Sequence, residues 1–301
     1  MKYFKLDSKT VVSLRGADRT ALLQRLCTQD LRLLPKSKVV ESFLTDVKGK
    51  TLAHGWIIDG SEELLVVVSG ELADKLVGHI DRYVIREDVI PVNESSKWSW
   101  FVVERGGLSL LGLEFDTESD LAIPKSVHAP STIQMTGIRT DAYTSDYCIA
   151  GCHTENLDDF YALMKELGGV LGDRLERERL RIEGGWPEFG VDFDGTALPQ
   201  EIDRDAKAIS FTKGCYLGQE TIARLDALGQ VQKKLLRLRI PNSCEVGLSA
   251  KIYVGENEAG WVTSQAYSKQ ENDVILFGFI KRSFHGRATS FSIDGHPATF
   301  L

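Results

Sequence analysis

The sequence predicts an α+β fold with antiparallel sheets, followed by a small all-β domain that we expect to be a barrel. Strand and helix patterns alternate along the first part of the chain, which is typical of α+β proteins. After Gln230 the pattern changes to short strands separated by glycine, asparagine, proline and aspartate, as in small barrels. The 301 residues suffice for two or three domains. We therefore expect one region at 1–230 and a second domain at 231–301.

The N-terminal part shows the clearest alternation of elements. Leu22, Leu23 and Leu26 fall on one side of a helical stretch, so that side should be buried. The run Asp-Val-Lys-Gly-Lys at 46–50 separates two alternating stretches and predicts a hairpin turn. The elements expected here are strands at 10–14, 39–45, 51–58 and 64–68 and helices at 18–27 and 71–83.

The middle of the chain has a weaker periodicity. Residues 183–211 contain glycines, prolines and acidic residues without a steady period, which predicts an extended functional loop. The other elements expected in the middle are strands at 98–103, 108–111, 133–139 and 147–150, a loop at 116–131, and helices at 157–167, 173–182 and 217–228. The strands expected in the C-terminal domain are 235–240, 250–254, 260–267, 274–280, 288–293 and 298–301.

The composition argues against several classes of protein. A formal net charge of −7 disfavours direct nucleic-acid binding, which needs a basic surface. No apolar run approaches ~18 residues, so we expect no membrane span. The first residues lack both the apolar stretch of a signal peptide and the Arg- and Ser-rich character of a transit peptide. A cytoplasmic location is expected.

The five cysteines show no repeated pair spacing. Cys148 and Cys152, followed by His153, resemble half a metal site, but the sequence has no second half, and a strand end with small apolar residues is the favoured interpretation. The acidic residues between 192 and 205 lack the order of a calcium loop. We expect no metal site, and we expect reduced thiols because no secretion signal is present.

The most specific motif is the run Lys-Gly-Cys-Tyr-Leu-Gly-Gln-Glu at residues 213–220. If the expected helix begins at Leu217, Cys215 precedes its N-terminus, where unpaired amide groups favour an anion. Lys213 adds a positive charge nearby, so a reactive thiolate at Cys215 is one interpretation. The other is a small buried residue that fills a corner of the core.

A second motif surrounds Glu183, which lies near the end of an expected helix and before two glycines. A carboxylate with room around it accepts two adjacent N–H groups of a flat heterocycle, and Trp186 would supply a ring on which that heterocycle stacks. The alternative is a salt-bridged helix end in which Glu183 pairs with Arg179. These residues alone favour the salt bridge.

Both motifs resemble those of the YgfZ-type folate-binding proteins. These proteins are relatives of the glycine-cleavage T-protein and include the mitochondrial iron–sulfur assembly branch. The cysteine motif is similar to their signature, and the second motif resembles their Arg-x-Arg-x-Glu-x-Gly-x-Pro pattern. Further similar segments are 26–31, 43–46 with 49–50, 260–264 and 278–282. The resemblance implies a T-protein-like fold: two intertwined α+β subdomains around a central folate cavity, followed by the barrel.

The resemblance also implies a function. It implies a tetrahydrofolate-binding factor that supports assembly or repair of iron–sulfur proteins, including enzymes that thiolate tRNA. Cys215 would be the functional thiol, beside Lys213. The implied cofactor is tetrahydrofolate or a one-carbon derivative, and the implied partners are folate and iron–sulfur client or assembly proteins. The residues implied at the folate are Glu183 on the pterin, with Arg181, Trp186, Glu201 and Arg224.

One departure from the T-protein pattern bears on the chemistry. Aminomethyl-transferring T-proteins carry an aspartate on the strand after the first hairpin turn, whereas residues 50–56 contain no acid and His54 lies about there. Histidine accepts a proton near pH 7, but it supplies no fixed negative charge. Three hypotheses stay open: the accessory factor, a folate-dependent aminomethyltransferase or demethylase acting on a small amine, and an interaction module that has lost folate.

Overall fold

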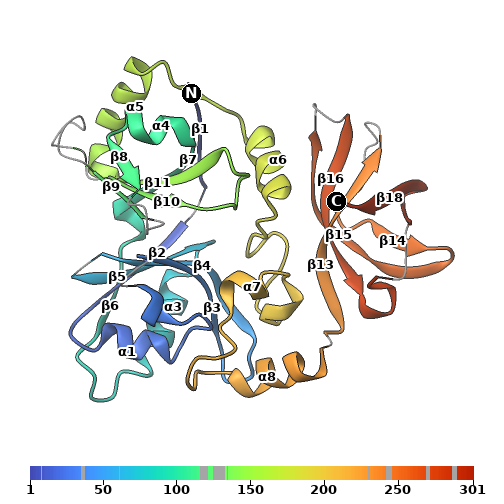
Figure 1. Ribbon diagram of the computed structural model, residues 1–301, viewed down its shortest axis with the longest axis horizontal. Helices are drawn as coiled ribbons and strands as arrows, with labels where there is room; N and C mark the ends of the chain where they lie inside the picture. The colour runs from blue at the N-terminus through green and yellow to red at the C-terminus, as the bar shows by residue number, and fades with distance from the viewer. Residues whose placement is uncertain are drawn as a thin grey trace.

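The structure is a computed structural model, and Figure 1 shows its two α+β layers with a barrel beside them. A five-stranded sheet carries α1 and α3, a seven-stranded sheet carries α4 and α5, and the barrel closes on itself; these counts refer to the described residues. The predicted α+β class and the C-terminal barrel are confirmed. The described residues are 1–7, 9–34, 38–60, 62–115, 121–124, 133, 135–229, 231–241, 246–268, 272–286 and 290–301.

The first sheet is antiparallel, with the order β3-β4-β5-β2-β6. Its central strand β5 is buried on both faces, because Val66 packs with the helices while Val67 packs toward the second sheet. A continuous apolar strand is the usual result of such two-sided burial. The elements are β2 (Lys9–Arg15), α1 (Arg19–Gln24), η1 (Leu31–Leu33), β3 (Val39–Thr45), β4 (Thr51–Asp59), β5 (Glu63–Ser69), α3 (Ala73–Asp81) and β6 (Ile90–Asn93).

The second sheet has the order β12-β1-β7-β11-β10-β9-β8. Trp100 and Val102 face the first sheet, while Phe101 and Val103 pack beneath the helices with Phe160. The chain therefore crosses between sheets at its start, since β1 belongs to this sheet and β2 to the other. The elements are β1 (Lys2–Lys5), η2 (Ser95–Lys97), β7 (Trp98–Glu104), α4 (Arg105–Leu110), β8 (Leu113–Phe115), β9 (Leu121–Pro124), β10 (Met135–Arg139), β11 (Tyr147–His153), η3 (Thr154–Asn156), α5 (Leu157–Glu166) and β12 (Val170–Leu171).

A helical segment leads from the second sheet to the barrel and runs between the three sheets in Figure 1. It consists of α6 (Arg174–Gly184), η4 (Pro199–Glu201), α7 (Asp205–Ala208) and α8 (Gln219–Leu228). Helix α6 begins where the Asp173 side chain accepts from the Glu176 amide, and it ends at Gly185, whose φ is +75°. The barrel strands are β13 (Lys233–Pro241), β14 (Lys251–Val254), β15 (Asn257–Ser268), β16 (Asp273–Lys281), β17 (Phe291–Ile293) and β18 (His296–Phe300), with η5 (Arg282–Phe284) after β16.

Several predicted elements were wrong. The strand expected at 108–111 is helix α4, because a short apolar run does not distinguish a buried helix from a strand. The helix expected at 18–27 ends at Gln24, and the loop expected at 183–211 contains η4 and α7. The loop expected at 116–131 includes β9; its other positions, and 288–289, lie outside the described residues. Among the described residues, no helix is long and apolar enough to cross a membrane.

Candidate functional site

Cys215 lies on the loop before α8 and is exposed, whereas Cys27, Cys148 and Cys152 are buried. The alternative that Cys215 fills a corner of the core is therefore wrong. Helix α8 begins at Gln219 rather than at Leu217, so the thiol lies four residues before the helix. The field of a helix terminus falls off within one turn, which removes the helix as a source of thiolate stabilisation. In the described part of the chain, no group of His, Cys, Asp and Glu could hold a metal ion.

Lys213 holds the cysteine loop in place instead of facing the thiol. Its Nζ donates to the backbone carbonyls of Gln24, Cys27 and Gln29 at 2.7, 2.8 and 2.8 Å. Burial is the main influence on this ammonium and lowers the pKa of Lys213. The prediction that Lys213 assists the Cys215 thiolate is corrected here, because three carbonyls at and just after the end of α1 take the donors of Lys213.

Gly218 joins the cysteine loop to the first hairpin. Its φ is +80°, and a Cβ placed on it would lie 2.6 Å from the Gly49 Cα and from the Asp46 carbonyl oxygen. The Thr45 hydroxyl also donates to the Leu217 carbonyl at 2.6 Å. Glycine is therefore required at 218 both by the backbone conformation and by the close approach of the hairpin.

We expect Gly218→Ala to lower the free energy of unfolding by about 1–3 kcal/mol, through backbone strain and steric overlap. Chemical denaturation measures this loss. Gly214→Ala is the matched control, because Gly214 has no atom within 4 Å of a built Cβ. Equal stability of the two variants would contradict this account of Gly218.

A hollow of about 350 Å³ opens beside Cys215. Ile85, which is 83% exposed, lies at this hollow. The Arg25 guanidinium pairs with Glu87 across the rim and holds the pKa of Glu87 at about 2. The surface around the thiol is thus mostly apolar with one ion pair. Its lining residues are Leu22, Arg25, Leu26, Tyr83, Ile85, Glu87, Cys215, Tyr216 and Leu217.

Glu183 forms a salt bridge with Arg179, which is the arrangement that the sequence around Glu183 favoured. Arg179 Nη1 donates to both carboxylate oxygens at 2.7 and 2.6 Å. The side chain of Glu183 is nevertheless 24% exposed and lines a hollow of about 640 Å³. Both the ion pair and an open carboxylate are present. The hollow is lined by Glu104, Arg105, Gly106, Thr144, Ser145, Asp146, Tyr147, Arg179, Leu180 and Glu183.

Trp186 is buried among other rings. It is 1% exposed, and its ring stacks with His54 at 4.5 Å and with Trp56 at 4.4 Å between centroids. Phe43 stacks on His54 at 4.5 Å, which extends the aromatic column. Because Trp186 is this buried and its ring already stacks on two others, it offers no open face to a heterocycle in this structure.

Arg181 is equally buried, at 1% exposure, and its donors are used within the protein. Nη1 donates to Asp192 at 2.5 Å and to the Trp186 carbonyl at 2.7 Å, and Nη2 donates to Ser264 at 2.9 Å. The guanidinium therefore connects α6, the loop after it and barrel strand β15. A structural role therefore accounts for the buried Arg181, and no bound ligand is needed to pair with it.

His54 lies in a buried network that the sequence did not reveal. Its Nε2 is 2.8 Å from Glu41 Oε1, and Arg204 pairs with the same carboxylate. Burial is the largest influence on the imidazole and lowers the pKa of His54, although Glu41 acts in the opposite direction. Arg204 also contacts Asp141 at 3.2 Å. The sequence signal for Arg204 was its position as a cation among acidic residues.

The two remaining predicted residues lie apart from Glu183's hollow. Glu201 is 6% exposed, and its Oε2 accepts from the Leu198 amide at 3.0 Å, so it caps η4. Arg224 is exposed on α8. The structure therefore brings neither of them to the Glu183 carboxylate.

Tetrahydrofolate, the cofactor that the resemblance implies, fits these residues in part. Glu183 offers a partly exposed carboxylate in a polar hollow that also contains Arg105, and a carboxylate suits the paired N–H groups of a pterin edge. Trp186 and Arg181 offer no exposed surface to it. A stacking role for Trp186 is therefore corrected to a packing role.

The sequence matches no protein-family model. It is 27% identical over 255 residues to the Mus musculus protein named iron–sulfur cluster assembly factor IBA57, mitochondrial, across 79% of this chain and 66% of that protein. The Homo sapiens counterpart is 28% identical over 254 residues, across 78% and 65%. The Yersinia enterocolitica protein named tRNA-modifying protein YgfZ is 25% identical over 264 residues, across 84% and 76%. The chain is a homologue of IBA57 and YgfZ.

The fold is that of aminomethyltransferase T. The crystal structure of glycine cleavage system aminomethyltransferase T from Bartonella henselae matches 99% of this chain and 84% of its own, with a TM-score of 0.78 and 14% identity. At that identity the likeness concerns the fold alone. The chain spans just under two thirds of the length of the two IBA57 proteins.

Proposed function

We propose that this chain is an accessory factor in the assembly or repair of iron–sulfur proteins, including enzymes that thiolate tRNA, with Cys215 as its functional thiol. The names of its homologues support a role in iron–sulfur protein assembly. The observation that supports Cys215 as the functional thiol is its exposure on a loop held by Lys213 and Gly218. A cytoplasmic location remains a prediction from the sequence.

The surface around Cys215 supports contact with another protein. Ile85, with the half-buried Tyr83 and Leu217, provides apolar contact area next to the thiol, and the Arg25–Glu87 pair provides a polar edge. Interfaces commonly combine an apolar centre with a polar rim. We propose that an iron–sulfur client or assembly protein docks here, so that its reacting group meets Cys215.

The test uses cells that lack the native protein and express variants of it. Cys215→Ala is expected to reduce the activity of iron–sulfur enzymes to the level of cells without the protein, while the purified variant keeps its melting temperature. Thr212→Ala, an exposed neighbour on the same loop, is the control. Full enzyme activity with Cys215→Ala would refute the role of the thiol.

Ile85→Glu tests the docking surface separately. The side chain is 83% exposed, so stability should change by less than about 0.5 kcal/mol, while iron–sulfur enzyme activity should fall. Leu175→Glu is the matched control, because Leu175 is 80% exposed and does not line this hollow. Equal effects of the two variants on iron–sulfur enzyme activity would show that the hollow beside Cys215 is not a docking surface.

We further propose that the chain binds tetrahydrofolate or a one-carbon derivative, with Glu183 accepting from the pterin. When bound, the cofactor supplies a carrier for one-carbon units. Glu183 and Arg105 in the polar hollow are the residues that would hold and orient it. Arg181 and Trp186 act on the site indirectly, by fixing the end of α6 and the turn after it.

Anaerobic calorimetric titration of tetrahydrofolate tests this proposal. Wild type is expected to bind saturably, and Glu183→Ala to bind at least ~10-fold more weakly, a loss of about 1.4 kcal/mol. Glu166→Ala, exposed on α5, is the control. A folded wild type that does not bind would favour the interaction module without folate.

The transferase alternative receives no support from the site. By the family resemblance, His54 lies about where T-proteins carry their aspartate, and it is 1% exposed and packed against Phe43 and Trp186. Burial lowers the pKa of His54, which favours the neutral ring at pH 7. A neutral, enclosed imidazole cannot stabilise a developing cation as a carboxylate would, so we propose an accessory role rather than aminomethyl transfer.

A further inference from the structure

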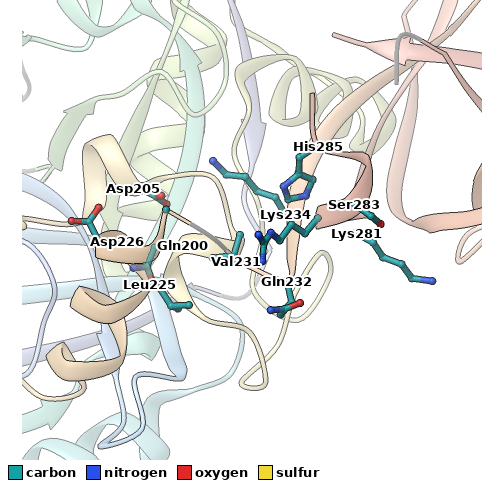
Figure 2. A pocket seen from close by; sticks show the side chains of 12 residues that line it. Gln200, Asp205, Leu225, Asp226, Val231, Gln232, Lys234, Lys281, Ser283 and His285 are labelled. Carbon is teal, nitrogen blue, oxygen red and sulfur yellow. The ribbon is translucent and has the colours of Figure 1, made fainter. Parts of the chain in front are cut away.

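A second polar hollow, of about 990 Å³, opens between the end of α8 and the barrel (Figure 2). Neither Cys215 nor Glu183 lines it, so it is separate from both sites above. Gln200 of η4, Asp205 of α7 and Asp226 of α8 lie on one side in Figure 2, with Lys234, Lys281, Ser283 and His285 across from them. The hollow thus has an acidic wall and a basic wall.

The acidic wall carries hydrogen-bond acceptors without donors. Gln200 is only 5% exposed; its Nε2 donates to the Ile222 carbonyl at 2.7 Å, while its Oε1 has no partner. Asp205 Oδ1 is likewise buried without a partner among the described residues. Buried acceptors without donors destabilise a protein. Burial is also the main cause that raises the pKa of Asp205 to about 6.

The cations of the basic wall differ in how they are paired within the described part of the chain. Lys234 pairs with Asp203 at 2.6 Å and Lys281 with Glu258 at 2.9 Å. Arg282, at the start of η5, forms no ion pair with any residue that the structure describes, and its side chain lines the hollow. A guanidinium is well suited to bind a carboxylate through two parallel hydrogen bonds.

We propose that this hollow binds a small zwitterion of the amino-acid type, with its ammonium group at Asp205 and Gln200 and its carboxylate at Arg282. The ammonium would supply the donors that the two unpartnered oxygens lack. The carboxylate would pair with the Arg282 guanidinium of the other wall. A single bound water would also satisfy the two oxygens, but it would give no preference for a molecule with one charge of each sign.

Matched probes separate these cases. The zwitterion 6-aminohexanoate, the diamine hexane-1,6-diamine and the diacid adipate have similar lengths and differ in their end charges; 4-aminobutanoate and 8-aminooctanoate vary the span. Calorimetric titration is expected to show saturable binding of at least one zwitterion, at least ~10-fold tighter than the diamine or the diacid. Comparable binding of the diamine or diacid, or no saturable binding to the folded protein, would overturn the proposal.

Variants connect the binding to the named residues. Asp205→Asn and Arg282→Gln are each expected to weaken zwitterion binding by about tenfold, whereas Arg174→Gln, an exposed arginine of α6, should leave it unchanged. Because Asp205 takes up a proton near pH 6, affinity should fall by about tenfold from pH 7 to pH 5. Unaltered binding by Asp205→Asn would refute the assignment.

Tetrahydrofolate titration into Asp205→Asn keeps this proposal distinct from the proposed folate site. Unchanged folate affinity is expected, because Glu183 and Asp205 line different hollows. Loss of folate binding in Asp205→Asn would assign this hollow to folate and overturn the zwitterion.

Discussion

Replacing Arg204 with alanine is expected to lower the free energy of unfolding by about 3–5 kcal/mol, because it leaves the Glu41 carboxylate buried without its cation. Arg204 and Glu41 are 8% and 9% exposed, and Arg204 Nε donates to Glu41 Oε1 at 2.8 Å. His54 remains beside the carboxylate, but burial lowers its pKa and favours the neutral ring. Urea denaturation measures the loss.

Arg174→Ala is the control for this experiment, since Arg174 is an exposed arginine at the start of α6. A loss below about 1 kcal/mol for Arg204→Ala would show that the network contributes little. The double variant Glu41→Gln with Arg204→Met removes both charges together and should recover part of the stability.

The Glu41 network also has an expected pH dependence. Burial alone would raise the pKa of Glu41, but hydrogen bonds from Arg204 and His54 outweigh it and hold the pKa below its usual value. The ionised carboxylate therefore stabilises the fold above its unfolded pKa of about 4.3, and this contribution is lost as the pH falls through the lower folded pKa. The stability difference between wild type and Arg204→Ala should narrow below about pH 4.

Asp192→Ala is expected to cost about 2–4 kcal/mol, because it removes the fully buried carboxylate that pairs with Arg181, while Glu178 still accepts from Arg181 Nε at 2.9 Å. The Asp192 side chain is fully buried and accepts from Arg181 Nη1 at 2.5 Å. It also accepts from the Glu188 amide at 2.8 Å and from the hydroxyls of Thr263 and Ser264 at 2.9 and 2.5 Å. The carboxylate thus connects α6 and the following loop to barrel strand β15.

The readouts for Asp192→Ala are chemical denaturation and amide hydrogen exchange. Exchange should accelerate in β15 more than in the five-stranded sheet, because the lost contacts lie on the barrel. Asp194→Ala, two residues away and exposed, should cost about 1 kcal/mol or less. Uniform acceleration through the whole chain would contradict a local connecting role for Asp192.

The sequence predicted the main sheets because their strands carry long apolar or alternating runs. It missed β1 and β6, which are four residues each; β6 contains Pro91 and lies at a sheet edge, where proline is tolerated. Strand β12 has two residues and forms only by pairing with β1. Such elements depend on contacts between distant segments rather than on local pattern.

In the candidate site, too, features with a local sequence pattern were predicted, and features that depend on distant contacts were not. The motif with Cys215 was found from local sequence, and its exposure agrees with a functional thiol. The partner of Lys213 was predicted wrongly, because sequence proximity suggested Cys215 while the fold brought the carbonyls at and just after the end of α1 to the ammonium. The Glu41–Arg204 pair joins residues far apart in the chain, so no local spacing in the sequence could predict it.

The early crossing of the chain between sheets affects the order in which the protein is completed during synthesis. Strand β1 precedes β2 in the chain, yet its neighbours β7 and β12 follow much later. Within the described residues, strands β2 to β6 form their ladders only with one another, so the first sheet can assemble while β1 is still without partners. Long sequence separations between contacts slow folding, and unpaired strands invite aggregation. Strand β1 is therefore among the last elements to be paired, and it stays open to chaperones and proteases until β7 has been made.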